Sequence, residues 1–280
     1  MISLKNILVP TDFSEPSKKA LTYGFTLARA FDSKLILAHI ASDPIALATK
    51  DVEKLVPVED KDSVRTIVKT GSVEDELLKI VRDESIDLVV MGTHGRRYPG
   101  HWFLGSVTEH ILRKVPVPVL TVSHVQPQRP VPGFVALKSI LYATDLSESS
   151  RIGIEYAIEL ARLSGAMLTV LHVIDDEDRM LWGPALLTYI DRPKIVDEFR
   201  HKLQEFVERE SVPGVAMEAL IAEGRPFRKI IEFAEERDVD IIVLNMQSKG
   251  MLDRVLLGST AERVVRLSKT PVLSVPIGVS

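Results

Sequence analysis

The chain contains a tandem internal repeat, and this duplication limits the possible folds more than any other feature of the sequence. Residues 4–29 align without a gap with residues 137–162, at an offset of 133 positions. Farther along, the offset becomes 153, so that Gly105-Ser106 aligns with Gly258-Ser259. Two copies of one unit in 280 residues predict two similar domains. We expect domains at 1–125 and 137–280, with a proline-rich linker at 126–136.

Each repeat alternates short runs rich in Ile, Val and Leu with segments of helical spacing. This alternation predicts an α/β fold with two tandem, open, parallel-sheet (Rossmann-like) domains of about five strands each and flanking helices. In the first repeat, strands are predicted at 5–9, 34–40, 64–69, 87–91 and 118–122, and helices at 15–30, 73–83 and 107–114. The spacing does not predict the order of the strands.

The change of offset places a length difference of 20 residues between the second and third strands. The second repeat has room there for a full helix at 193–210, with apolar residues at helical spacing. The first repeat has only residues 41–63, where we expect a shortened helix or a loop with one or two turns.

Composition excludes several classes of protein. The net charge of −4 provides no general attraction for nucleic acid. The absence of cysteine excludes disulfides and thiolate metal sites. The N-terminal segment lacks the apolar core of a signal peptide, and no apolar stretch approaches the ~20 residues of a membrane span. We therefore expect a cytoplasmic protein without nucleic-acid or membrane partners.

A glycine-rich segment follows the fourth predicted strand. Gly92 and Gly95 are followed, after nine residues, by Gly105 and Ser106. Glycines let a backbone turn sharply and approach a ligand closely, and a helix N-terminus favours anions, so this spacing suits a phosphate. Ser106 and Glu109 form an S-x-x-E pattern that predicts a capping box. The alternative is that these glycines are only turn and cap residues.

Other candidates follow from the parallel sheet, because the carboxyl ends of its strands meet at one rim. Asp12 follows the first strand, and His39-Ile40 ends the second. Asp12 and its counterpart Asp145 suit a turn as well as a ligand, but Ser14 and Ser147 are suited to cap the following helices, which leaves the aspartates for a ligand. We expect His39 and His172 to be buried, hydrogen-bonded side chains rather than catalysts.

These motifs resemble the universal stress protein family, in a tandem form with two UspA-like domains. The resemblance rests on Pro10-Thr11-Asp12, on His39-Ile40 and on the G-x2-G-x9-G-S motif, and it covers nearly the whole chain. It implies a sensor or regulator of the stress response that binds ATP, with Mg²⁺ as a candidate companion ion. By position, the implied nucleotide-binding residues of the first repeat are Pro10, Thr11, Asp12, Ile40, Met91, Gly92, Gly95, Gly105, Ser106 and Val107.

The second repeat departs from this motif. Asn245 and Ser248 occupy the positions of Gly92 and Gly95, and Ala143 replaces Pro10. Because an asparagine side chain fills space that glycine leaves open, we expect weaker nucleotide binding there and a structural role as the partner in an intramolecular pseudo-dimer; a homodimer of whole chains is a further option. Second-tier candidates are Arg96, Arg97, His101, Asp145, Val173, Gly258 and Ser259.

Two features of the loops have competing interpretations. Arg96, Arg97 and His101 suit contacts to phosphates but equally suit a solvated loop. The acidic run at 175–178 suits a divalent cation, but it lacks a defined ligand pattern, and a solvated loop is favoured. We predict no metal site. Trp102-Phe103 is expected to pack as an apolar lid or interface.

The sequence nominates no catalytic residue. It contains no P-loop lysine motif, no G-x-S-x-G elbow and no H-E-x-x-H. We therefore expect binding rather than catalysis, with slow hydrolysis of ATP or of another adenylated metabolite as the alternative. A third interpretation is a scaffold that binds no nucleotide and pairs through the strands at 118–122 and 271–276.

Overall fold

The computed structural model describes residues 4–41, 45–93, 104–123, 137–175, 192–246 and 257–277. Several predictions lie outside these residues. They concern Gly95, Arg96, Arg97, His101, Trp102-Phe103, Ser248, the linker at 126–136 and the acidic residues 176–178.

The first repeat contains the predicted strands and helices, with bounds that differ by at most one residue. In order, its elements are β1 (Asn6–Pro10), α1 (Glu15–Phe31), β2 (Lys34–Ala41), α2 (Ile45–Glu53), η1 (Val58–Asp60), β3 (Val64–Thr70), α3 (Val73–Asp83), β4 (Leu88–Gly92), α4 (Ser106–Lys114) and β5 (Val119–Val122). The short α2 and the single turn η1 confirm the expected reduced crossover between the second and third strands.

The second repeat has the same order of elements. They are β6 (Ser139–Thr144), α5 (Ser150–Ser164), β7 (Met167–Ile174), α8 (Arg192–Glu210), β8 (Met217–Glu223), α9 (Pro226–Glu236), β9 (Ile241–Asn245), α10 (Ser259–Leu267) and β10 (Val272–Val275). The 19 residues of α8 stand where the first repeat has the 9 residues of α2, which confirms the predicted long helix.

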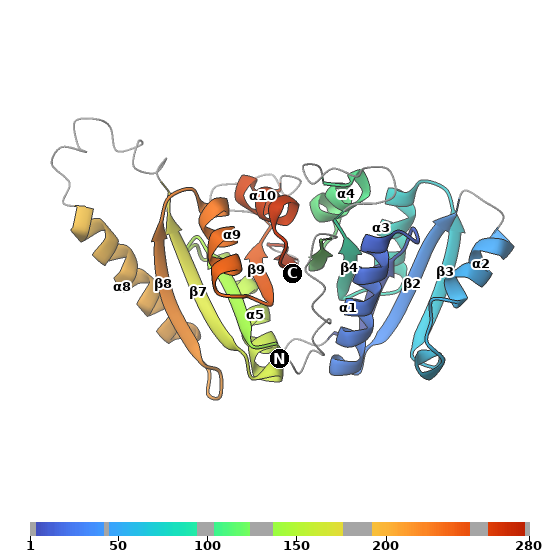
Figure 1. Ribbon diagram of the computed structural model, residues 1–280, viewed down its shortest axis with the longest axis horizontal. Helices are drawn as coiled ribbons and strands as arrows, with labels where there is room; N and C mark the ends of the chain where they lie inside the picture. Colours follow the sequence, from blue (N-terminus) through green and yellow to red (C-terminus); the bar gives the residue numbers. More distant parts are fainter. Residues whose placement is uncertain are drawn as a thin grey trace.

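The described strands form a single sheet of ten strands, in the order β3-β2-β1-β4-β5-β10-β9-β6-β7-β8. Pairing is parallel within each repeat, as predicted. The two halves lie side by side (Figure 1) and meet where β5 and β10 pair antiparallel; in the register of this pair, Leu120 lies opposite Leu273. The strands at 118–122 and 271–276 therefore pair with each other within one chain. We call this junction the seam.

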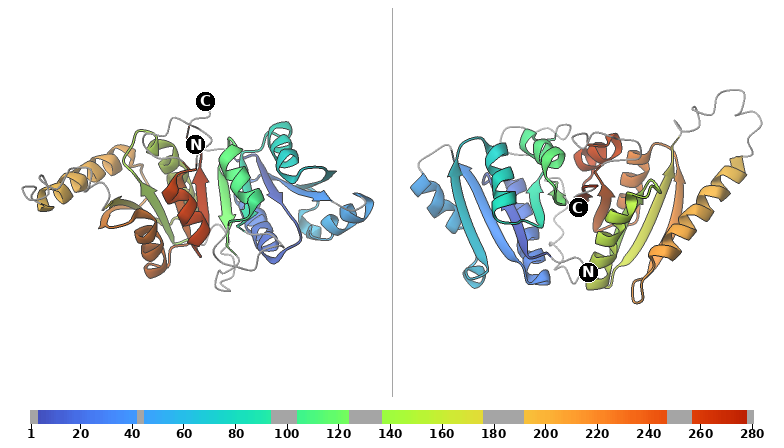
Figure 2. Two further views of the ribbon diagram at one scale, coloured as in Figure 1. Left: turned by 90° about the horizontal axis from the view of Figure 1, so that it is seen from above. Right: turned by 180° about the vertical axis from the view of Figure 1, so that it is seen from behind.

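Helices cover both faces of the sheet (Figure 2). Along β1, Ile7 and Val9 pack in the apolar cluster that includes residues of α1 and α5, whereas Leu8 packs in the cluster that includes residues of α3 and α4. Burial on both faces is the physical reason that these strands are continuous apolar runs instead of alternating ones.

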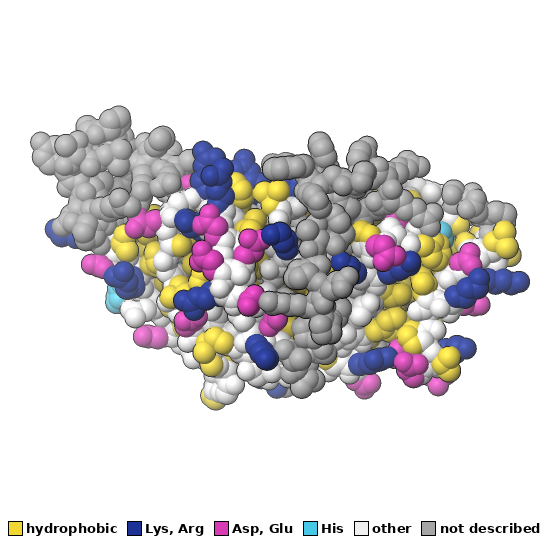
Figure 3. Space-filling view, viewed as in Figure 1, with side chains coloured by type: hydrophobic (Ala, Val, Ile, Leu, Met, Phe, Trp, Pro, Cys, Tyr) yellow, Lys and Arg dark blue, Asp and Glu magenta, His cyan; other side chains and the backbone are white. Residues whose placement is uncertain are grey.

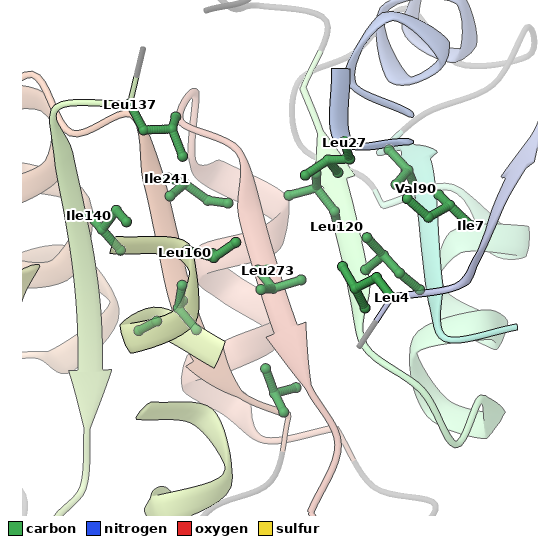
Figure 4. Close-up of a cluster of buried hydrophobic side chains, with 14 of the residues drawn as sticks. Leu4, Ile7, Leu27, Val90, Leu120, Leu137, Ile140, Leu160, Ile241 and Leu273 are labelled. Atoms are coloured by element: carbon green, nitrogen blue, oxygen red, sulfur yellow. The ribbon is translucent and has the colours of Figure 1, made fainter. Parts of the chain in front are cut away.

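The seam is also a place of apolar packing. Leu120 and Leu137 lie near Leu160 and Leu273, and a small cavity of about 40 Å³ remains among the side chains of both repeats (Figure 4). All four leucines belong to one buried cluster that includes residues of both repeats. The two repeats therefore share a hydrophobic core as well as a sheet.

The surface agrees with the mixed composition. Lysine and arginine side chains are interspersed with aspartate and glutamate on the face shown in Figure 3. Among the described residues, no helix combines the length and apolar character needed to cross a lipid bilayer.

Candidate nucleotide site

The strand order places the candidate residues of the first repeat at a switch point. Strand β1 lies between β2 and β4, so the strands that follow it in the sequence lie on both sides of it in the sheet. The ends of β1 and β2 are joined by two hydrogen bonds, from the Thr11 N–H to the Ala38 carbonyl (2.8 Å) and between His39 Nδ1 and the Thr11 carbonyl (2.7 Å). Ligands of open parallel sheets bind at such points.

Asp12 lies in a tight turn between β1 and α1. Its Oδ1 accepts hydrogen bonds from the Ser14 N–H (3.0 Å) and the Ser14 hydroxyl (2.5 Å), and Phe13 adopts a left-handed conformation (φ 64°). The Ser14 hydroxyl oxygen in turn accepts from the Ser17 N–H (3.4 Å), which confirms Ser14 as the cap of α1. These bonds engage one carboxylate oxygen of Asp12, whereas we expected Ser14 to cap α1 without Asp12.

Thr11 has a structural role in the same turn. Its buried hydroxyl accepts a hydrogen bond from the Phe13 N–H (3.1 Å) and lies 3.1 Å from the Ser17 hydroxyl. Pro10 is the last residue of β1. The contacts of Thr11 therefore shape the turn that carries Asp12.

Gly92 ends β4 beside the first turn of α1. A Cβ at this position would lie 2.8 Å from Pro16 Cβ and 3.0 Å from the Pro16 carbonyl carbon, which is closer than such atoms approach. The carbonyl of Gly92 accepts a hydrogen bond from the Thr108 hydroxyl (2.9 Å). Close packing of β4 against α1 thus requires glycine here whether or not a ligand is bound, which favours the alternative interpretation of this one glycine.

The turn into α4 differs from the predicted capping box. Gly105, in extended conformation, is the cap residue, and Ser106 is already helical. The Gly105 N–H donates to the Thr93 carbonyl (2.9 Å), and the Gly105 carbonyl accepts from the Glu109 N–H (2.9 Å). The Glu109 carboxylate binds Arg113 (2.9 Å). The prediction was wrong by one residue, because the backbone of Gly105 makes the bonds that begin the helix.

The start of α4 nevertheless provides what an anion needs. The first N–H groups of a helix have no partner within it, and they carry the positive end of its dipole. Ser106 is exposed, and Val107 is half-buried. The sheet order thus brings this helix start to the same rim as Asp12 and Ile40, while Met91 is a buried residue of β4.

His172 is buried and hydrogen-bonded, as predicted, whereas His39 is hydrogen-bonded but only half-buried. His172 is 7% exposed, and its Nδ1 lies 2.9 Å from the Thr144 carbonyl, as His39 Nδ1 lies near the Thr11 carbonyl. His39 packs against Phe13 with ring centroids 4.7 Å apart. Both rings tie the ends of two strands together.

The corresponding turn of the second repeat begins its helix later. Ser147 does not cap α5, which begins at Ser150 after Ser149. Asp145 Oδ1 instead accepts from the Ser147 N–H (3.0 Å) and hydroxyl (2.6 Å) and from the Ser150 hydroxyl (2.6 Å). A reason for the later start is that Ser149 replaces Pro16, whose ring presets a helical φ in the first turn of α1.

Asn245 is accommodated by changes around it. Its Nδ2 donates to the Ser149 carbonyl (3.1 Å), and its Oδ1 accepts from the Tyr142 hydroxyl (3.1 Å). The same hydroxyl lies 2.5 Å from the Ser150 carbonyl, and burial raises the pKa of Tyr142 above its ordinary value. A Cβ on Gly153 would lie 2.2 Å from Asn245 Oδ1. The amide is therefore packed against the start of α5.

A cavity of about 510 Å³ lies at the carboxyl ends of β6, β7 and β9 and the start of α10. Its lining includes Asp145, His172, Val173, Asp175, Gly258 and Ser259. The structure thus brings together all four second-tier candidates of the second repeat. Sequence reasoning missed Phe199 of α8, which also lines the cavity; its place on the predicted long helix was the available signal. No group of three or more metal-ligating side chains occurs among the described residues.

The fold and the site define a class of proteins. These are tandem α/β proteins in which each half is a parallel sheet with a candidate ligand-binding edge at its switch point. Comparison with known sequences gives the family. The model of the universal stress protein family matches residues 3–62, 46–123 and 136–276, so the chain belongs to this family.

Relatives of known name agree. Universal stress protein MJ0577 of Methanocaldococcus jannaschii is 30% identical over 155 residues, which cover 50% of this chain and 96% of that protein. Universal stress protein Rv2623 of Mycobacterium tuberculosis is 29% identical over 189 residues, covering 66% of this chain and 60% of that protein. The solved structure of a universal stress protein from Archaeoglobus fulgidus shares the fold over 99% of this chain and 100% of its own, with a TM-score of 0.71 at 22% identity.

Proposed function

We propose that this universal stress protein binds an adenine nucleotide, with ATP the first candidate and Mg²⁺ its companion, and acts as a sensor or regulator in the stress response. The nucleotide is held mainly by the first repeat. The observation that carries the proposal is the meeting of Asp12, Ile40 and the start of α4 at one switch point, in the repeat whose glycine motif is intact.

The parts of this rim have complementary chemistry. The N-terminus of α4 suits phosphates, and the turn that holds Asp12 presents a carboxylate, a group that accepts hydrogen bonds from ribose hydroxyls. Binding would act on a regulatory surface only if the ligand favours one conformation over another.

The first test is to identify the small molecule that accompanies the purified protein. We expect mass spectrometry of the denatured protein to release an adenine nucleotide, and ATP with Mg²⁺ to raise the Tm of the nucleotide-free protein. Failure of both would refute the proposal.

A matched pair of variants locates the site. Gly105 and Gly258 have almost the same extended backbone (φ −61°, ψ 141° and φ −61°, ψ 140°), a conformation in which aspartate is a favourable N-cap. Gly105→Asp should therefore leave the fold intact but weaken ATP binding by about tenfold or more, since it places a carboxylate near the phosphates. Gly258→Asp should leave ATP binding close to that of the original protein.

The same proteins separate binding from catalysis. If the chain hydrolyses ATP or another adenylated metabolite, phosphate or AMP release must increase with protein concentration and disappear in Gly105→Asp. Nucleotide that is recovered unchanged after hours supports binding alone.

A further inference from the structure

We infer that the second repeat has a ligand site of its own and that this site takes a nucleoside, or a similar uncharged planar compound with hydroxyl groups, in preference to a nucleoside triphosphate. The ligand class rests on the proposed function, because the two repeats share part of the site. The existence of the site rests on the cavity at the ends of β6, β7 and β9.

Hydrogen bonds within the protein hold Asn245, a lining residue of the cavity, in place. At about 510 Å³ the cavity lies in the range of small-molecule pockets. Asn245, at the position of Gly92, lines it, yet both polar ends of the amide are hydrogen-bonded within the protein, to Ser149 and Tyr142. Gly153 leaves the space that the amide oxygen occupies. The Asn245 side chain is thus packed against the start of α5, and the cavity remains.

The two repeats share the groups that would meet a nucleoside. Asp145 is held in a turn like that of Asp12, with its Oδ1 fixed by three donors instead of two. The Gly258 N–H donates to the Met246 carbonyl (2.7 Å) and begins α10, as Gly105 begins α4. A carboxylate accepts hydrogen bonds from the hydroxyls of a sugar, so this part of the site is retained.

An aromatic wall is specific to the second repeat. Phe199 comes from α8, the helix that is longer than its counterpart in the first repeat, and it lines the cavity. Its ring stacks on His172 with centroids 4.9 Å apart and planes 25° apart. The Lys202 Nζ also lies 5.5 Å from the centroid of the Phe199 ring, so the His172–Phe199 pair forms an apolar wall of the cavity rather than a free stacking face.

The charge of the described lining residues disfavours a polyanion. Asp145 and Asp175 are among them, and no lysine or arginine is. The start of α10 contributes only about half a positive charge. Within this described lining, the two aspartates outweigh the helix terminus, and a triphosphate would bring further negative charge next to them.

The test uses the full chain carrying Gly105→Asp, which weakens ATP binding in the first repeat, with adenosine and ATP as probes in equilibrium dialysis. We expect this variant to bind adenosine about tenfold or more tightly than ATP. Adding Phe199→Ala should weaken this adenosine binding by about tenfold, which assigns it to the second repeat, with the melting curve as the control for folding. Adenosine binding that is absent in Gly105→Asp, or unaffected by Phe199→Ala, would overturn the inference.

The charge argument has its own test. In the Gly105→Asp protein, Asp175→Asn should tighten ATP binding by about fivefold to tenfold and change adenosine binding little. The matched control is Glu148→Gln, which neutralises an exposed carboxylate outside the cavity lining. Equal effects of the two changes would show that the cavity does not select by charge.

The two proposals fail separately. If the original protein binds ATP but Gly105→Asp binds no adenosine, the second site falls and the proposed function stands. If Gly105→Asp binds adenosine, Phe199→Ala weakens that binding and the original protein never binds ATP, the proposed function falls and the second site stands.

Discussion

At Gly92 and Ser274, packing within the protein limits which side chain fits, independently of any ligand. Gly92 allows β4 to approach Pro16 at the start of α1. Ser274, in β10, is fully buried, and its hydroxyl has no hydrogen-bond partner among the described residues. Its counterpart Thr121, in β5, donates to the Val272 carbonyl across the seam (3.2 Å).

Gly92→Ala should destabilise the protein in the absence of any ligand. The added methyl group meets the backbone of Pro16, which cannot move aside like a flexible side chain, so we expect a loss of about 2–3 kcal/mol in the free energy of unfolding. Urea denaturation measures it. Gly214→Ala, at an exposed turn glycine (φ 84°) with open space around it, should cost only about 1 kcal/mol. Equal costs would contradict the packing argument.

Ser274→Ala should be neutral or should stabilise the protein by about 1 kcal/mol, because it removes a buried hydroxyl without a partner. Thr121→Val, which keeps the shape but removes a hydrogen bond, should instead destabilise it by about 1 kcal/mol. Thermal unfolding of the two variants under one condition compares them. A loss in Ser274→Ala as large as that in Thr121→Val would mean that the serine hydroxyl does have a partner.

At the scale of elements, the two helices that follow the first strand of each repeat start differently. Pro16 lies in the first turn of α1, whereas α5 begins at Ser150 and is held by Tyr142 and Asn245. In each case the last residue of a neighbouring strand, Gly92 or Asn245, fits against that helix start. The two repeats therefore use different contacts for the same arrangement of elements.

Tyr142→Phe and Asn245→Ala should each destabilise the protein by about 1–2 kcal/mol, because each leaves buried polar groups without a partner. Their combined effect should be smaller than the sum, with a coupling energy of about 1 kcal/mol, since both changes remove the bond between the two side chains. A double-mutant cycle by chemical denaturation measures the coupling. Strict additivity would show that the contact contributes nothing.

The buried Tyr142 hydroxyl predicts a loss of stability in alkali. Its pKa is raised in the folded protein by burial, so the unfolded chain, with an ordinary tyrosine pKa of about 10, releases the proton more readily. This contribution to stability is complete below about pH 10 and is lost as the pH rises further. The free energy of unfolding should therefore fall more steeply above pH 10 in the original protein than in Tyr142→Phe. Parallel pH profiles would contradict this prediction.

At the scale of the whole molecule, the seam makes one body of two repeats. Strands β5 and β10 each have a neighbour on both sides in the described sheet, so their pairing is completed within the chain. Arg113 of α4 also lies 3.9 Å from Glu262 of α10 across the seam. The boundaries 1–125 and 137–280 remain a prediction, but the halves share a buried cluster.

Leu273→Ala should destabilise both repeats together. The side chain lies opposite Leu120 and in the cluster shared by the halves, so we expect a loss of about 2–4 kcal/mol and a single unfolding transition. Hydrogen exchange measures each half separately, through amides of β4 and β9. Loss of protection in β9 alone would show that the repeats unfold independently.

The sequence by itself determined the duplication, the succession of strands and helices, the long α8 and the caps that depend on neighbouring residues, such as Ser14. These features follow from local patterns, in which a residue and its near neighbours set the conformation. Where a local pattern had two close solutions, as at Ser106 and Ser147, the prediction missed by one or two residues.

Only the tertiary structure decided how distant residues meet. Pro16 is the contact that requires glycine at position 92, Tyr142 and Ser149 receive the amide of Asn245, and the side chains around Asp145 leave a cavity in the repeat with the altered motif. The strand order and the pairing of β5 with β10 are also contacts between residues far apart in the chain. Such contacts depend on the shape and volume of both partners, which the spacing of residues along one chain does not specify.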